Sequence, residues 1–190
     1  MQWRPIWRKL TGHTGSPNSR ATSSAIASTS LSPVLGSRKS ATIEDTTIED
    51  FDRLFAVNVR AAFFLVQQLL PILSKGSSII LVASLAARGV VGTIPAYAAT
   101  KGAIKTLVKH FASLFGPRGI RVNAVAPGIV ETDMSNFTKT EAGRDLALGM
   151  QAFKRLAQPD DIGGVVAFLA SEDARWVTGD IIHVAGGSKL

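Results

Sequence analysis

The sequence predicts an α/β protein built on a parallel β-sheet that is covered by helices on both faces. Short, continuous apolar runs, which suit buried strands, alternate along the chain with long segments of helical hydrophobic spacing. The chain has 190 residues, 46% hydrophobic and 18% charged, which is enough for one domain with a substantial core. It contains no cysteine, so the sequence offers no disulfide and no zinc–thiolate site.

The first predicted helix begins at Thr47, which suits an N-cap position, with Asp50 three residues later. The positions that then recur at helical spacing are Phe51, Leu54, Phe55, Asn58, Val59, Ala62 and Leu65. The pattern predicts a helix that continues to Ser74, with a bend near Pro71 and a stop at Gly76.

A buried strand is predicted over residues 78–83, where the run Ser-Ile-Ile-Leu-Val-Ala is uninterrupted. The loop that follows is marked by Gly89, Gly92 and Pro95. A second long helix is predicted from Tyr97 to Phe115, and it ends at the Gly-Pro pair that follows.

The rest of the chain repeats this alternation. A second strand is predicted over residues 121–126, followed by a flexible stretch around residues 133–152. A helix over residues 159–170 and a last strand over residues 181–184 complete the pattern. Strands that alternate with long helices favour a parallel sheet.

Residues 1–43 differ in character from the remainder. They are rich in Ser and Thr and hold six Lys and Arg residues but no acidic residue, so we expect a disordered segment, with an organelle transit peptide as the alternative. Residues 44–190 carry 15 basic and 14 acidic residues, a net charge of +1, so no nucleic-acid partner is predicted. No run of 18 apolar residues occurs, so no membrane partner is predicted and a cytoplasmic location is expected.

Tyr97 and Lys101 lie four residues apart on the second predicted helix, so their side chains share one face. A neighbouring ammonium group favours the phenolate form of a tyrosine, which suits the pair to acid–base chemistry. Ser84 ends a buried strand at its carboxyl end, where open parallel sheets bind ligands. Taken alone, a tyrosine and a lysine at this spacing are usually an ordinary pair on a helix surface.

Five segments spread over residues 44–190 extend this pattern. They are Phe55-Ala56-Val57-Asn58-Val59, Ile80-Leu81-Val82-Ala83-Ser84, Tyr97-Ala98-Ala99-Thr100-Lys101-Gly102-Ala103, Gly119 to Gly128 with Thr132, and Val177-Thr178-Gly179-Asp180 to Gly186-Gly187. Together they resemble the short-chain dehydrogenase/reductase family, as a member whose N-terminal part is truncated or altered. The resemblance implies a Rossmann-like, doubly wound parallel sheet whose N-terminal nucleotide-binding strands are largely missing.

The resemblance also implies roles for the matching residues. Tyr97 would be the general acid/base, and Lys101 would lower its pKa and hold the nicotinamide ribose. Ser84 would orient the carbonyl, and Asn58 would support a proton relay through water, with a satisfied helix polar group as the alternative for Asn58. The residues expected to contact NAD or NADP are Tyr97, Lys101, Pro127, Gly128, Val130 and Thr132. No metal is expected, because the three histidines have no metal-ligand spacing.

The family's Gly-rich phosphate-binding turn is not found in residues 1–43. The nearest candidate, Thr11-Gly12-His13-Thr14-Gly15, has the wrong glycine spacing and follows no apolar strand. We therefore hypothesise an N-terminal truncation, with out-of-frame sequence in place of the usual start. Three strands would then remain, and residues 78–83 would form an apolar edge that residues 21–35 or another subunit would have to cover.

The resemblance predicts an NAD(P)-dependent oxidoreductase that interconverts a small-molecule carbonyl and a secondary alcohol. The competing hypothesis is an inactive family remnant that acts as an oligomerising or interaction protein. The two long helices resemble the family's dimer interface, so a homodimer or homotetramer is expected. The apolar residues that form either a substrate lid or ordinary core contacts are Met134, Phe137, Leu146, Leu148, Met150 and Phe153. The substrate, and the choice between NAD and NADP, stay open.

Overall fold

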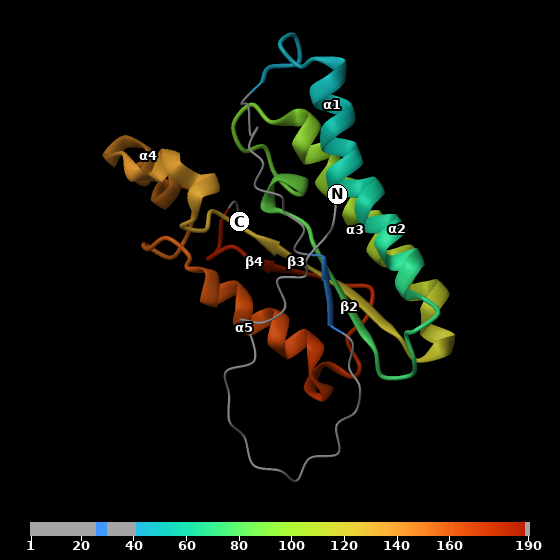
Figure 1. Cartoon of the computed structure of the whole chain (residues 1–190). Helices are drawn as coiled ribbons and strands as arrows, with labels where there is room; N and C mark the ends of the chain where they lie inside the picture. The colour runs from blue at the N-terminus through green and yellow to red at the C-terminus, as the bar shows by residue number, and fades with distance from the viewer. Residues whose placement is uncertain (1–25, 30–40, 189–190) are drawn as a thin grey trace.

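A computed structural model of the chain describes residues 26–29 and 41–188, which form a four-stranded sheet with helices on both faces (Figure 1). The strands are β1 (Ile26–Thr29), β2 (Ser78–Val82), β3 (Arg121–Pro127) and β4 (Ile181–Val184). They lie side by side in the order β1-β2-β3-β4, and each neighbouring pair is parallel. The predicted α/β class and parallel sheet are therefore confirmed.

The sheet has one strand more than the sequence pattern predicts. β1 comes from the segment expected to be disordered, and it pairs with β2 from Ile26 opposite Ser78 to Thr29 opposite Leu81. The expected count of three strands is therefore wrong, whereas of the two expected ways to cover the edge of β2, the one by residues 21–35 is confirmed. β1 escapes prediction because four residues within a Ser/Thr-rich stretch are too few to show a hydrophobic period. The candidate turn at residues 11–15 lies outside the described residues.

Helices pack in two layers, one on each face of the sheet (Figure 1). One layer contains α1 (Ile48–Phe55), a π-helical turn (Ala56–Arg60), α2 (Ala61–Leu69) and α3 (Pro95–Phe115). α3 lies directly on β2 and β3, and α1 and the π turn pack on α3. α5 (Pro159–Ala170), which has the predicted bounds, covers the other face. Within the described part of the chain, no helix combines the length and apolar character needed to cross a bilayer.

Alternate residues of the central strands supply two separate cores. Ile79 and Leu81 of β2 join the large apolar cluster beneath α3. Ile80, between them, joins a second cluster that includes Leu169 of α5. Burial on both faces explains why β2 appears in the sequence as a continuous apolar run rather than as an alternating one.

The first helix starts where the sequence predicts but ends earlier. The Thr47 hydroxyl accepts a hydrogen bond from the Asp50 N–H at 3.1 Å, which confirms the predicted N-cap. The last helical residue is Leu69 rather than Ser74. Pro71 explains the difference, because proline has no N–H to continue the helical hydrogen bonds, although Leu70 itself keeps helical dihedral angles.

Residues 133–152, which were expected to be flexible, are largely helical. They form a 3-10 helix (Asp133–Lys139) and α4 (Glu141–Gly149), which lies away from the sheet (Figure 1). The Thr140 hydroxyl caps α4 by accepting the Gly143 N–H at 3.2 Å. The expectation was wrong because both helices are short and α4 buries only one of its residues, which leaves little apolar periodicity to detect.

Buried polar side chains fasten the amino end of the sheet to the end of α5. The Arg121 guanidinium, at the start of β3, donates to the carbonyls of Leu169 at 2.7 Å and Ser171 at 3.1 Å. The Ser78 hydroxyl, at the start of β2, donates to the same Leu169 carbonyl at 2.9 Å. These bonds satisfy carbonyls that the last turn of a helix leaves without intrahelical partners.

Candidate active site

The amine of Lys101 is buried between α3 and the sheet, with 8% of the residue exposed. Its Nζ donates a hydrogen bond at 3.0 Å to the carbonyl of Val82, the last residue of β2. Burial lowers the pKa of Lys101 from 10.5 to about 8. A side chain with a perturbed pKa therefore lies at the carboxyl edge of the sheet, where open α/β folds bind their ligands.

Tyr97 lies one turn before Lys101 on the same face of α3. The Lys101 Nζ is 5.6 Å from the centre of the Tyr97 ring, and the tyrosine is half-buried. α3 begins at Pro95 rather than at Tyr97 as predicted, because proline is well suited to the first helical position. The extra residues place Tyr97 within the first turn of a formed helix, whose dihedral angles fix the direction of its side chain.

Ser84 lies just beyond β2, at the same sheet edge as the Lys101 amine. It is half-buried, and its hydroxyl oxygen accepts the Ala86 N–H at 3.1 Å. This bond caps the short 3-10 helix Leu85–Ala87 and holds the serine in place. A serine hydroxyl also carries a proton that it can donate, so Ser84 can act on a bound oxygen while remaining a cap.

Asn58 lies in the π-helical turn and reaches across to α3. Its Nδ2 donates to the Thr100 hydroxyl oxygen at 3.0 Å, and this hydroxyl donates to the Tyr97 carbonyl at 2.7 Å. π-helical turns are uncommon and often mark functional sites. Asn58 is thereby connected to the turn of α3 that carries Tyr97 and Lys101.

The chain closes tightly against β4 immediately after β3. Pro127 is the last residue of β3, and the Gly128 N–H donates to the Val184 carbonyl at 3.1 Å. A Cβ added at Gly128 would lie 3.0 Å from the backbone and side chain of Ala185. Glycine is therefore the residue that allows this close approach of the two backbones.

The next residues form a turn that is held by Ser135. The Ser135 hydroxyl is buried, donates to the Val130 carbonyl at 2.5 Å and accepts the Thr132 N–H at 3.0 Å. Val130 also forms a parallel bridge with Ala157, while Thr132 is exposed. The predicted cofactor-binding residues after β3 thus follow the same sheet edge that Ser84 follows after β2.

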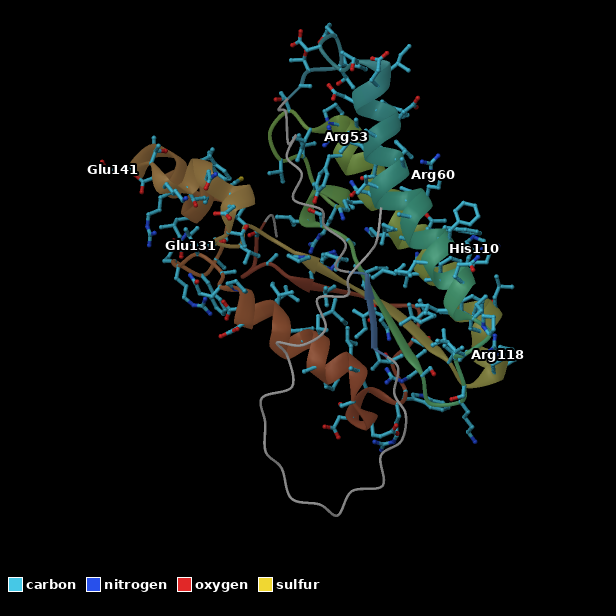
Figure 2. The ribbon with its side chains drawn as sticks, viewed as in Figure 1. Arg53, Arg60, His110, Arg118, Glu131 and Glu141 are labelled. Atoms are coloured by element: carbon cyan, nitrogen blue, oxygen red, sulfur yellow. The ribbon has the colours of Figure 1, made fainter. Side chains whose placement is uncertain are left out.

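Figure 2 labels further titratable side chains, of which only Glu131, between Val130 and Thr132, belongs to the turn described above. His110 and Arg60 are exposed on the layer formed by α2 and α3, and Glu131 and Glu141 lie near α4. Over residues 26–29 and 41–188, no three His, Cys, Asp or Glu side chains gather in an arrangement that could hold a metal ion.

Comparison with known proteins places this geometry in a family. A family model described as enoyl-(acyl carrier protein) reductase matches residues 25–189, a range that includes β1 as well as the residues discussed above. The chain belongs to the short-chain dehydrogenase/reductase family. The resemblance seen in its sequence motifs is therefore confirmed.

Several short-chain dehydrogenase/reductases resemble this chain over most of its length. An uncharacterized oxidoreductase of Methylorubrum extorquens is 43% identical over 150 residues, which cover 77% of this chain and 60% of the relative. A 7α-hydroxysteroid dehydrogenase of Bacteroides fragilis is 37% identical over 152 residues, covering 79% and 59%. The crystal structure of the angucycline C-6 ketoreductase LanV with bound NADP has a TM-score of 0.73 at 40% identity, covering 77% of this chain and 57% of that one. The chain spans about 60% of the length of the curated relatives it matches.

Two polar residues of this short-chain dehydrogenase/reductase support the site but receive no role from its sequence motifs. Thr100 and Ser135 each join the backbone of one predicted site residue to another group. The available signals are the position of Thr100 directly before Lys101 and the three-residue spacing from Thr132 to Ser135. Such spacings also occur in ordinary helix caps, so sequence alone does not single these residues out.

Proposed function

We propose that this chain binds NAD or NADP and interconverts a carbonyl and a secondary alcohol, with Tyr97 as the general acid/base. The observation that carries the proposal is the pairing of Tyr97 with the buried amine of Lys101, at the same sheet edge as Ser84. The similarity to a ketoreductase with bound NADP supports both the cofactor class and the reaction class. The substrate class is a small ketone or secondary alcohol.

The residues that follow β3 fit the nicotinamide end of such a cofactor. Pro127 and Gly128 run closely along β4, and Val130 and Thr132 continue from them at the carboxyl edge of the sheet. Lys101 offers an ammonium group for the ribose hydroxyls. When bound, the nicotinamide would supply or accept a hydride. The fit extends to this end only, since residues 1–43 contain no Gly-rich turn for the pyrophosphate.

Proton transfer is the part of the reaction assigned to the chain itself. In the reducing direction, the Tyr97 phenol gives its proton to the carbonyl oxygen while the carbonyl carbon accepts the hydride. In the oxidising direction, the phenolate takes the proton back from the alcohol. Lys101 stabilises the phenolate through its charge, and Ser84 donates a hydrogen bond to the reacting oxygen. Asn58 supports the site from the π turn, where the proposed water relay would reach solvent.

A cofactor titration tests this proposal. We expect saturable quenching or enhancement of NADH or NADPH fluorescence by the purified 190-residue chain. Tyr97→Phe should retain binding and lose turnover of ketones. Lys101→Met should weaken binding by about tenfold to a hundredfold, because a hydrogen bond to a charged group contributes about 1.5–3 kcal/mol. Absence of binding at millimolar cofactor would contradict the proposal.

A catalytically silent, self-associating remnant is the second candidate, and a homodimer or homotetramer is proposed in either case. The layer of α1, α2 and α3 leaves large apolar side chains in contact with solvent. They are Phe51, Phe63, Phe64 and Leu114, exposed by 42%, 39%, 49% and 66%. Sedimentation of the wild type beside Phe64→Ser tests the interface: a smaller assembly in the variant is expected, and a monomeric wild type would contradict it. Dimerisation without cofactor binding would favour the remnant.

We also propose that the protein works in the cytoplasm, without a membrane or nucleic-acid partner. The near-neutral charge of residues 44–190 supports this, as does the small-molecule chemistry proposed for the site. Fractionation of cells that express the tagged chain tests the location, and recovery in an organelle would favour the transit-peptide alternative for residues 1–43.

A further inference from the structure

Thr100 is the one fully buried side chain that lies between the proposed acid/base and its lysine on α3, with 0% of its surface exposed. Its hydroxyl makes two hydrogen bonds: it accepts from Asn58 Nδ2 at 3.0 Å and donates to the Tyr97 carbonyl at 2.7 Å. A hydroxyl has one proton to donate, so the direction of both bonds is determined.

One of the two Thr100 hydrogen bonds is local to α3, and the other joins distant parts of the chain. A bond from a threonine hydroxyl to a carbonyl three residues earlier is a common local feature of helices. The bond from Asn58 is different, because it joins residues 42 positions apart and crosses from the π turn to α3. The Tyr97 carbonyl is also the group that a regular helix pairs with the N–H of Lys101. The bridge therefore acts at the turn that sets Tyr97 relative to Lys101.

We propose that Thr100 is a positioning residue for the Tyr97–Lys101 pair, with its hydroxyl coupling the π turn at Asn58 to the first turns of α3. The assignment rests on the proposed function, which gives the pair its role. Without the hydroxyl, the Asn58 amide and the Tyr97 carbonyl lose a shared partner inside the protein, and this turn of α3 is free to adjust. Lys101 and Tyr97 titrate as a coupled pair, in which the phenolate favours the charged lysine and the charged lysine favours the phenolate, and this mutual stabilisation would weaken.

Tyr97 is the only tyrosine in the chain, so its ionisation can be observed directly. The ultraviolet absorbance of the phenolate, followed as a function of pH without any cofactor, reports the titration midpoint of this one side chain, and Tyr97→Phe supplies the baseline. Thr100→Val removes the hydroxyl and keeps the β-branched shape, while Thr100→Ser keeps the hydroxyl. Thr106→Val is the matched control, since Thr106 is exposed on the same helix.

We expect Thr100→Val to raise the midpoint of Tyr97 by about half a pH unit or more, which corresponds to the loss of one ordinary hydrogen bond. Thr100→Ser and Thr106→Val should leave the midpoint unchanged. Asn58→Ala, which removes only the donor from the π turn, should raise it as well, and the combination with Thr100→Val should be less than additive. Asn58→Ala keeps the test valid if Thr100→Val does not fold.

A purely structural role makes a different prediction. If Thr100→Val or Asn58→Ala lowers the Tm but leaves the Tyr97 midpoint where it is in the wild type, the positioning role is wrong. NADH binding is measured in parallel on the same proteins. A shifted midpoint in a chain that binds no NADH would count against the proposed function alone, whereas an unshifted midpoint with intact NADH binding would count against Thr100 alone.

Discussion

The part of the molecule that carries Tyr97 and Lys101 and the part that follows β3 are held together by different forces. α3 and the central strands share a cluster of fifteen buried apolar residues. Residues 129–158 bury only three in a cluster of their own, namely Ile129, Ala147 and Leu156. This second region depends instead on hydrogen bonds, such as those of Ser135 and of Gln151, whose buried amide donates to the carbonyl of Phe153 at 2.8 Å.

The difference separates a fixed part of the site from an adjustable one. Acid–base chemistry needs a pair of side chains held within a fraction of an ångström, and a large close-packed core provides this. Recognition of different substrates needs a region whose shape can change without unfolding the protein. A single hydrogen bond contributes about 0.5–1.5 kcal/mol net, which is less than a large buried apolar side chain contributes. We therefore expect the two regions to respond differently to the same substitution.

Truncation of one leucine in each region should show the largest contrast. Leu81→Ala removes a fully buried side chain of β2 and should lower the free energy of unfolding by about 2–5 kcal/mol. Leu156→Ala should cost less, because its small cluster can collapse around the cavity and lies next to solvent. Denaturation by urea measures both. Equal losses would contradict the proposed division between the regions.

Replacement of Lys101 should reveal the cost of burying its charge. At pH 7 the amine is protonated in the folded and the unfolded chain, and a pKa lowered from 10.5 to about 8 corresponds to about 3 kcal/mol of unfavourable burial. Lys101→Met should therefore be more stable than the wild type at pH 7 while binding the cofactor more weakly. Between pH 8 and 10.5 the unfolded chain binds more protons than the folded chain, so the stability of the wild type should rise with pH. The difference in stability between Lys101→Met and the wild type should therefore become smaller over this range.

The control for this measurement is Lys109→Met, a replacement at an exposed lysine of the same helix. It should change neither the stability at pH 7 nor its dependence on pH. A Lys101→Met variant that is less stable than the wild type at every pH would show that the hydrogen bond to Val82 outweighs the desolvation of the amine.

Two glycines of α4 sharpen the comparison from the other side. A Cβ at Gly143 would lie 1.9 Å from the Phe137 carbonyl oxygen, so Gly143→Ala must force α4 away from the preceding 3-10 helix. We expect a loss of about 1–3 kcal/mol and a local increase in hydrogen exchange over residues 133–149. Gly149→Ala meets no atom within 4 Å and should instead stabilise slightly. Loss of protection throughout the sheet in Gly143→Ala would mean that the two regions unfold together.

The smallest expected effect concerns the ion pair at the base of this region. Arg155 donates two bonds to the Asp161 carboxylate, at 2.7 and 2.8 Å, and holds the pKa of Asp161 well below its usual range. The contribution of the pair should be complete above the unfolded pKa of about 4 and should disappear as the carboxylate is protonated at lower pH. Asp161→Asn should lower the Tm at pH 7 by less than Gly143→Ala does. The difference from wild type should shrink in high salt and in acid, and a difference that is constant with pH would exclude the ion pair as its source.

The sequence predicts the first region better than the second because apolar burial leaves a periodic signal. β2, α3, β3 and α5 lie within two residues of their expected bounds, since each is buried on a whole face or on both. α4 and β1 were missed, because short elements that are held by caps and by backbone pairing leave almost no periodic apolar signal in the sequence. For the site, the motifs indicate Ser84, Tyr97 and Lys101, but the bond between Asn58 and Thr100 depends on how two helices cross. A sequence pattern confined to one helix does not record such a crossing.

The π turn between α1 and α2 has a consequence for insertions and deletions. A π turn accommodates one residue more than the regular helix on either side of it, and each residue of a helix advances it by about 100°. Removal of a single residue from Ala56–Arg60 would make the helix regular. It would also rotate either Asn58 or the whole of α2 by about 100° about the helix axis, relative to α3. The local helix would gain in regularity while the π turn lost its contact with α3. A change in length at this turn is therefore more damaging than most changes of side chain, and relatives that keep the site should also keep its length.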